Sequence, residues 1–180
     1  MKKSWFLVLA GMAMALVFTS TPALAQAKGY VGATAGLSVP NADDTSSRLA
    51  YGVIGGARLD GELGFGAYFL TSSKEEDVSG SKVDFNYALY GIEGSFHFEG
   101  VADGAFIGLR VGTTKLDVGT TFSSSPTHFG LVFGYDKFLN DNFSLGVEGS
   151  WMSIESSSDS GVEAEGFQAL NFNIAAKAWF

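Results

Sequence analysis

Apolar and polar residues alternate along most of the chain, and the last eleven residues show the pattern most clearly. From Leu170 to Phe180 the even positions are apolar, whereas the odd positions include Asn171, Asn173 and Lys177. Successive side chains of a β-strand point to opposite faces, so this segment is predicted to be a strand with one apolar and one polar face. A strand that ends on an aromatic residue is typical of a closed barrel, whose last strand pairs with the first while its apolar face meets lipid.

The same alternation predicts seven further strands. With the closing strand, the expected bounds are Tyr30–Val39, Arg48–Leu59, Leu63–Thr71, Lys82–Phe98, Ala105–Leu116, Phe129–Phe138, Phe143–Ile154 and Gly166–Phe180. In the fourth segment the apolar residues up to Leu89 share one parity, and those from Ile92 onward share the other. One inserted residue between Leu89 and Gly91 would bring both halves into step, so we expect a β-bulge there.

The connections between the predicted strands alternate in length. Residues 60–62, 99–104 and 140–142 form short turns, whereas residues 40–47, 72–81, 117–128 and 155–165 form longer loops rich in Ser, Asp and Glu. Short turns on the side of both termini, with longer loops opposite, are the arrangement of bacterial outer-membrane barrels. We therefore expect both termini to be periplasmic and the acidic loops to be extracellular.

The first 25 residues have the pattern of a secretory signal. Lys2 and Lys3 precede an apolar run, and small residues at Ala23 and Ala25 form a cleavage site; Ala25 and Ala27 offer a second one. The run is shorter than the roughly 20 residues that a spanning helix requires. We predict a cleaved signal peptide at 1–25 and one barrel domain at 26–180. With no cysteine in the chain, neither a lipid anchor nor a disulfide is expected.

The charge of the mature chain narrows the possible partners. Removal of Lys2 and Lys3 leaves nine basic residues against 19 acidic ones, a net charge of −10. This argues against nucleic-acid binding, which requires a basic face. No apolar run after the signal approaches 18 residues, so the chain is expected to cross a membrane only as a closed barrel.

Residue size indicates which face of the barrel points outward. Along the predicted strands, the alternate positions on the apolar face hold Phe, Tyr, Trp, Leu and Val. The positions on the opposite face hold largely Gly, Ala, Ser and Thr. An eight-stranded barrel has an interior just wide enough for side chains to fill, so the bulky set is expected to face lipid. Aromatic residues expected at the membrane interfaces are Tyr51, Tyr87, Tyr135, Trp151 and Phe180. The predicted fold is all-β, an eight-stranded antiparallel up-and-down transmembrane barrel.

The segment Phe129–Trp151, FGLVFGYDKFLNDNFSLGVEGSW, resembles the sixth strand, turn and seventh strand of the OmpA-like, OmpX-like and opacity-protein group of small outer-membrane barrels. The resemblance implies outer-membrane lipid and lipopolysaccharide as surroundings, with periplasmic chaperones and the barrel-assembly machinery as partners. It also implies that the terminal Phe180 is an assembly signal. No peptidoglycan-binding segment follows the barrel in this sequence, so a wall-tethering role is not expected. The protein is expected to be a monomer.

Charged residues on the inward parity are predicted to form a structural salt-bridge network in the lumen. They are Arg58, Glu93, Arg110, Asp136, Glu148 and Lys177. The predicted register places Glu93 opposite Arg110, and buried charges must be paired. A filled lumen is the main interpretation because the interior is narrow. The alternative is a salt-bridge gate on a path for ions or small solutes.

No enzymatic chemistry is predicted. Lipid A deacylases of this size carry a His-x-Ser motif, but Phe129 and Gly130 follow His128. Ser95 precedes His97 by two residues, which places successive inward positions about 7 Å apart, a distance judged too long for a catalytic relay. We therefore expect a non-enzymatic protein with no catalytic residue.

The acidic loops lack the spacing of a calcium-binding loop, so no metal or cofactor is expected. Basic residues near the outer rim are candidate contacts for lipopolysaccharide phosphates, as charge-assisted donors; they are Arg48, Lys74, Lys82 and Lys115. The expected function is that of a non-enzymatic outer-membrane barrel with exposed acidic loops, serving envelope structure, as a surface antigen or in adhesion. A narrow channel is the alternative.

Overall fold

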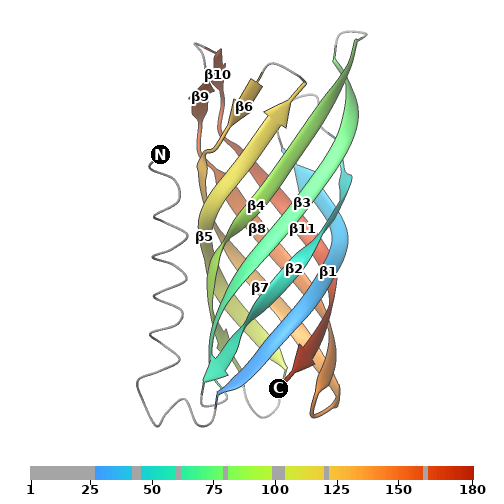
Figure 1. Ribbon diagram of the computed structural model, residues 1–180, viewed down its shortest axis with the longest axis vertical. Coiled ribbons are helices and arrows are strands. Elements are labelled where there is room, and N and C mark those ends of the chain that lie inside the picture. The colour runs from blue at the N-terminus through green and yellow to red at the C-terminus, as the bar shows by residue number, and fades with distance from the viewer. Residues whose placement is uncertain are drawn as a thin grey trace.

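Eight long antiparallel strands form the wall of a barrel in the computed structural model (Figure 1). The structure describes residues 27–41, 46–59, 62–78, 81–98, 104–119, 122–159 and 162–180, so the predicted signal peptide at 1–25 lies outside the described residues. The wall strands are β1 (Lys28–Pro40), β2 (Arg48–Leu59), β3 (Leu63–Val78), β4 (Ser81–His97), β5 (Ala105–Val118), β7 (Thr127–Asn140), β8 (Phe143–Ile154) and β11 (Phe167–Trp179). No helix among the described residues is long and apolar enough to cross a membrane.

The barrel closes between its first and last strands. Each wall strand pairs with its neighbour in the chain, and β1 pairs with β11 in a continuous register from Tyr30 opposite Trp179 to Pro40 opposite Ala169. Gly29 and Phe180 extend this seam by exchanging two backbone hydrogen bonds of 2.9 and 3.0 Å. The predicted eight-stranded up-and-down barrel is thereby confirmed, and closure leaves no free edge along the wall.

On most strands the bulky apolar side chains point outward and the small or polar ones point into the lumen, as predicted. On β7, Phe129, Leu131 and Phe133 point outward and are 46–55% exposed, whereas Val132 between them is fully buried. On β11 the even positions from Leu170 to Phe180 point outward, and the odd positions are buried in the lumen. The core of the molecule is therefore the filled interior of the barrel.

Strand β4 differs from the prediction. Its register with β3 runs without interruption from Leu63 opposite Phe96 to Val78 opposite Ser81, and its register with β5 is equally regular. The expected bulge at Leu89 to Gly91 is therefore absent. Tyr87 and Leu89 instead point into the lumen and are each 1% exposed, so the prediction of Tyr87 as an interfacial residue was also wrong. The apolar residues of β4 point into the lumen up to Leu89 and outward from Ile92 onward, because part of the lumen is itself apolar.

The barrel has two distinct ends. At the turn end lie the end of β2, the start of β3, the end of β4, the start of β5, the turn at 141–142 and the carboxyl terminus, at the bottom of Figure 1. The loop end, opposite, carries extensions of the wall. Strands β3 and β4 continue there as a hairpin in which Glu75 lies opposite Asp84. Short strands β6 (Phe122–Ser124), β9 (Ser157–Asp159) and β10 (Val162–Ala164) also lie there. Three of the expected loops therefore contain β-structure.

Candidate functional site

The turn-end half of the lumen is organised around one arginine. The Arg110 Nη2 atom lies 2.7 Å from Glu93 Oε2 and 2.8 Å from Glu148 Oε1, and Arg110 Nε donates to Glu93 Oε2 at 2.8 Å. Glu93 on β4 and Arg110 on β5 are register partners, and Glu148 comes from β8. One guanidinium therefore bridges the buried carboxylate of Glu148 and the half-buried carboxylate of Glu93, and this geometry joins three strands of the wall.

A second ion pair lies in the same half. Lys177 Nζ donates to Asp136 Oδ2 at 2.6 Å, and both side chains are buried. The ammonium group also lies 4.9 Å from the centre of the Phe106 ring, within the range of a cation–π contact. Arg58 lies on the lumen-facing parity of β2, half-buried and opposite Gly64. The structure thus brings five of the six predicted charges into two ionic groups, with Arg58 nearer the turn end.

A buried histidine lies next to the ionic groups. Thr114 Oγ1 lies 2.9 Å from His128 Nδ1, and the hydroxyl of Tyr68 contacts His128 Nε2. The Tyr68 ring in turn lies 4.7 Å beneath the guanidinium carbon of Arg110. Sequence analysis did not find this chain of contacts. All of these residues face the lumen, but Tyr68 on β3 contacts residues of β5 and β7, which are not its neighbours in the wall.

His97 and Ser95 are closer than the sequence indicated. Ser95 Oγ and His97 Nε2 lie 3.2 Å apart and share a buried hydrogen bond. The inference that successive inward side chains stay about 7 Å apart was wrong, because side chains lean along the strand toward each other. The His97 ring packs against Phe106, with 5.3 Å between ring centres.

An apolar cluster fills much of the loop-end half of the lumen, beside buried polar side chains such as Ser38 and Ser72. The cluster is formed by Ala50, Ile54, Tyr68, Leu70, Tyr87, Leu89, Leu116, Met152, Ile154, Phe167, Ala169 and Ala175. Three aromatic rings, those of Phe85, Tyr87 and Phe167, meet edge to face with 6.4–6.5 Å between centres. This half contains the bulky inward residues that sequence analysis did not expect.

Arg48 caps the apolar half at the loop end. It is 3% exposed, its guanidinium carbon lies 4.6 Å from the centre of the Phe85 ring, and Nη1 donates to the Phe85 carbonyl at 3.3 Å. The prediction of Arg48 as a lipopolysaccharide contact is therefore wrong, because Arg48 occupies the lumen-facing parity of β2.

The other basic residues of the loop end are engaged with neighbouring groups. Lys82 and Lys115 are exposed and pair with Glu75 at 2.6 Å and Asp117 at 2.8 Å. Lys74 donates to the Ser47 carbonyl at 3.2 Å. Their contact with lipopolysaccharide stays a prediction.

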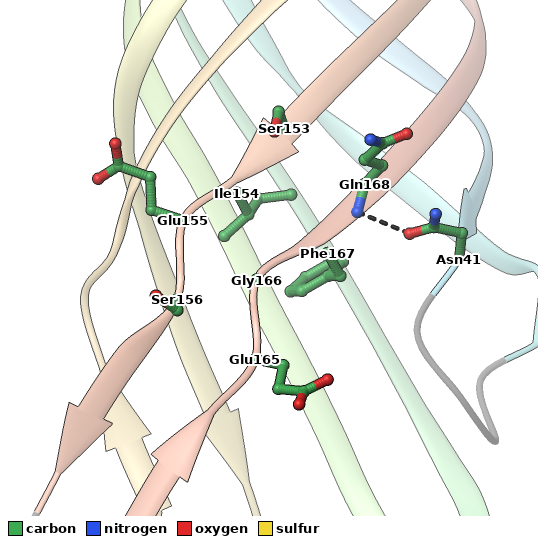
Figure 2. A pocket seen from close by; sticks show the side chains of 9 residues that line it. All are labelled: Asn41, Ser153, Ile154, Glu155, Ser156, Glu165, Gly166, Phe167 and Gln168. Carbon is green, nitrogen blue, oxygen red and sulfur yellow. Dashed lines mark hydrogen bonds between the residues drawn. The ribbon is translucent and has the colours of Figure 1, made fainter.

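A pocket of about 700 Å³ opens at the loop end (Figure 2). It lies where the ends of β1, β8 and β11 meet the segments that lead to β9 and β10. Its lining residues are Asn41, Ser153, Ile154, Glu155, Ser156, Glu165, Gly166, Phe167 and Gln168. Sequence analysis did not find this pocket, because its walls come from distant parts of the chain.

The closed wall, its apolar outer surface and its filled lumen define a small transmembrane β-barrel. Residues 10–178 match the model of the outer membrane protein beta-barrel domain family, and the chain belongs to that family. The protein is therefore an outer-membrane barrel. None of the curated proteins matches the chain significantly.

Solved structures with the same fold include three small barrels. Neisserial surface protein A is 15% identical with a TM-score of 0.69, and the match covers 84% of this chain and 97% of that one. OprG from Pseudomonas aeruginosa is 14% identical with a TM-score of 0.55, covering 86% and 95%. Ail of Yersinia pestis, in complex with the heparin analogue sucrose octasulfate, is 14% identical with a TM-score of 0.52, covering 86% and 99%.

Proposed function

We propose that the protein is a non-enzymatic, closed outer-membrane barrel that acts at the cell surface through its loop end. The observation that supports this most strongly is the filling of the lumen at two successive levels. The turn-end half is filled by the ionic groups of Arg110 and Lys177, and the loop-end half by the apolar cluster that includes Tyr87 and Leu89. With the lumen filled, the loop end is the part of the molecule available to partners.

The proposal includes an orientation. The loop end, with the β3–β4 hairpin and β6, β9 and β10, faces the environment, and both termini face the periplasm, as in other bacterial barrels with short periplasmic turns. Lys82 and Lys115 then lie at the level where lipopolysaccharide phosphates are found. Charge reversal of both residues is expected to weaken lipopolysaccharide co-purification, and unchanged co-purification would end this part of the proposal.

Epitope tags test the orientation directly. A short tag inserted between Val78 of β3 and Ser81 of β4, which pair with each other at the loop end, is expected to bind antibody on intact cells. The same tag at Asp141, in the turn between β7 and β8, is expected to bind antibody only after the outer membrane is permeabilised. Antibody binding to the Asp141 tag on intact cells would overturn the orientation.

The terminal Phe180 is proposed as the assembly signal. Its side chain is 76% exposed, whereas its backbone completes the β1–β11 seam through Gly29. Deletion of Phe180 is expected to reduce insertion in cells more than it reduces refolding into detergent. An equal reduction in both would leave the residue with a purely structural role.

The absence of catalysis is also part of the proposal. His97 and Ser95 hydrogen-bond to each other in the filled lumen, and both ring nitrogens of His128 contact hydroxyl groups, so neither histidine faces an open substrate site. Substitution Ser95→Ala is expected to leave any esterase activity of the purified protein at the background level. Hydrolysis by the wild type that S95A abolished would contradict this.

One observation favours the second candidate function, a narrow channel. Three inward side chains have polar atoms with no hydrogen-bond partner within the described part of the protein: Thr34, Asn171 and Asn173. Such atoms are suited to a hydrated path. In a channel gated by the Arg110 group, Glu93→Ala would change the conductance of single molecules in a planar bilayer. In a closed barrel, it would not.

A further inference from the structure

An outer groove lies on the wall where the neighbouring strands β7, β8 and β11 run side by side. Its volume is about 510 Å³. The outward side chains that line it are 43–67% exposed, and they are Phe133, Tyr135, Val147, Phe172 and Ile174. Glu148 and Asn173, which face the lumen from the same strands, also line it. The outer groove therefore lies within the apolar band that faces lipid in a barrel of this family.

The outer groove depends on a glycine. Gly149 occupies an outward position of β8, opposite Phe133 of β7 on one side and Phe172 of β11 on the other. A Cβ at Gly149 would lie 2.5 Å from Cζ of Phe133, so the Phe133 ring leans over the glycine. Gly149 is buried as a result, although its position points outward. A side chain at this position would displace the ring or fill the outer groove.

One cation stands on the turn-end side of the outer groove. Lys137 is exposed, lies opposite Leu145, and follows Phe133 and Tyr135 on the outward face of β7. Among the outward positions of the wall strands that the structure describes, Lys137 is the only charged residue in the turn-end half. Tyr135 lines the outer groove and lies between Lys137 and Phe133 along the strand. The cation and the groove thus form one continuous surface.

The charge of Lys137 calls for a partner outside the chain. A cation on the lipid-facing surface is costly unless it reaches a polar group. The outward lysines of the loop end, Lys82 and Lys115, have carboxylate partners within the chain. No ion pair or hydrogen bond joins Lys137 to another residue of the described ranges. A lysine packs its methylene stem on apolar surface while its ammonium group reaches the membrane interface, where phospholipids present phosphate.

We propose that Lys137 and the outer groove bind one glycerophospholipid, with the phosphate on the Lys137 ammonium group and an acyl chain along the groove over Gly149. Lys137 and Phe133 are separated by four residues, about 13 Å along an extended strand, a distance that an acyl chain spans. The ammonium group donates charge-assisted hydrogen bonds to the phosphate oxygens. The lipid belongs to the periplasmic leaflet; this part rests on the proposed orientation, in which the turn end faces the periplasm.

Native mass spectrometry of the full chain, refolded in micelles of a non-ionic detergent, measures the binding of single lipids. The probe is palmitoyl-oleoyl phosphatidylglycerol. The comparison lipid is palmitoyl-oleoyl glycerol, which has the same acyl chains and no phosphate. The expected result is saturable binding of one phosphatidylglycerol molecule, about tenfold tighter than that of the diacylglycerol, because only the first lipid offers an anion to Lys137.

Two variants separate the headgroup from the acyl chain. Lys137→Met is expected to weaken phosphatidylglycerol binding about tenfold and to leave diacylglycerol binding unchanged, because only the phosphate contact is lost. Gly149→Leu fills the outer groove and is expected to weaken the binding of both lipids. Lys28→Met is the matched control and is expected to bind as the wild type does. Lys28 is an exposed lysine of the same end, but its ammonium group donates to the Asp141 carbonyl at 3.2 Å.

Equal affinity of the wild type and K137M for phosphatidylglycerol would overturn the proposal, as would equal losses in K137M and K28M or equal binding of the two lipids. A protein dimer that Gly149→Leu abolishes would assign the outer groove to a second copy of the chain instead. Lys137-dependent binding of lipid A that is tighter than that of phosphatidylglycerol would overturn the assignment to a glycerophospholipid.

The tag experiment tests the orientation separately, because binding in micelles does not depend on it. Loss of lipid binding would leave the result of the tag experiment unchanged. A failed tag experiment with intact phosphatidylglycerol binding would overturn only the assignment of the lipid to the periplasmic leaflet.

Discussion

The two halves of the lumen are filled by opposite kinds of chemistry. In the turn-end half, five charged side chains hold one another through ion pairs of 2.6–2.8 Å. In the loop-end half, Leu70, Tyr87, Leu89 and Met152 are almost completely buried and pack as in the core of a soluble protein. The contrast shows that the interior of a barrel of this width can be filled by charge pairing or by apolar packing. It also means that the two halves respond differently to mutation.

The largest effect is expected from Arg110. Substitution Arg110→Met leaves the carboxylates of Glu93 and Glu148 without their shared cation, and removing one partner of a buried ion pair costs about 4 kcal/mol. Urea unfolding of the refolded protein, followed by tryptophan fluorescence, measures this loss. The control is Lys82→Met, whose ion pair with Glu75 is exposed and contributes about 0.5 kcal/mol. Equal losses in R110M and K82M would show that burial of the ionic group has no energetic importance.

A smaller loss is expected in the apolar half. Leu89→Ala removes a fully buried side chain and leaves a cavity, which lowers the free energy of unfolding by about 3 kcal/mol. Leu109→Ala is the matched control, because Leu109 points outward and is 66% exposed, so its truncation leaves no enclosed cavity. A larger loss in L109A than in L89A would contradict the packing described for this half.

The boundary between the halves is tested at Tyr68. Its ring lies beneath Arg110 and its hydroxyl contacts His128, so Tyr68→Phe keeps the ring and removes one hydrogen-bond partner of a buried histidine. The free energy of unfolding is expected to fall by about 2 kcal/mol. The imidazole resonances of His128 should shift in the same variant. Unchanged stability with unchanged imidazole resonances would show that the two halves are not linked at this point.

The smallest effect is expected outside the lumen. The hydrogen bond from Lys115 lowers the pKa of Asp117, so the small contribution of this surface pair to stability is present above the usual titration range of a carboxyl and is lost as the pH falls. Lys115→Ala is expected to raise the pKa of Asp117 without a measurable change in unfolding. A carbon NMR titration of the carboxyl group measures the shift. An unchanged pKa would show that the pair does not persist in solution.

Much of the fold could be predicted from alternation alone. Strands such as β7 and β11 have one apolar and one small or polar face, and there the predicted orientation was correct. Strand β4 was predicted wrongly because its inward residues Phe85, Tyr87 and Leu89 are as bulky as its outward ones. The apolar residues of β4 therefore face inward near the loop end and outward near the turn end, and alternation alone cannot tell which of the two faces meets lipid. The continuous register with β3 and β5 supplied the missing information.

The site was less predictable than the fold. Parity placed Glu93 opposite Arg110, but the contact of Arg110 with Glu148 depends on side chains that reach across the lumen. Arg48 was assigned to the outer rim from its position next to a polar loop, although its own parity pointed inward. The loop-end pocket joins Asn41 to Gln168, 127 residues apart. No sequence pattern within a single strand predicts a contact between such distant residues.

The central claim is that the ionic groups of the turn-end half and the apolar cluster of the loop-end half each close the lumen. Single-molecule conductance in planar bilayers tests this claim most directly. Four proteins are compared: the wild type, Glu93→Ala with Arg110→Ala, Tyr87→Ala with Leu89→Ala, and the variant that combines all four substitutions. We predict conductance steps only for the combined variant, because each double variant keeps one half of the lumen filled. Conductance steps in the wild type, or steps in either double variant equal to those of the combined variant, would contradict the account.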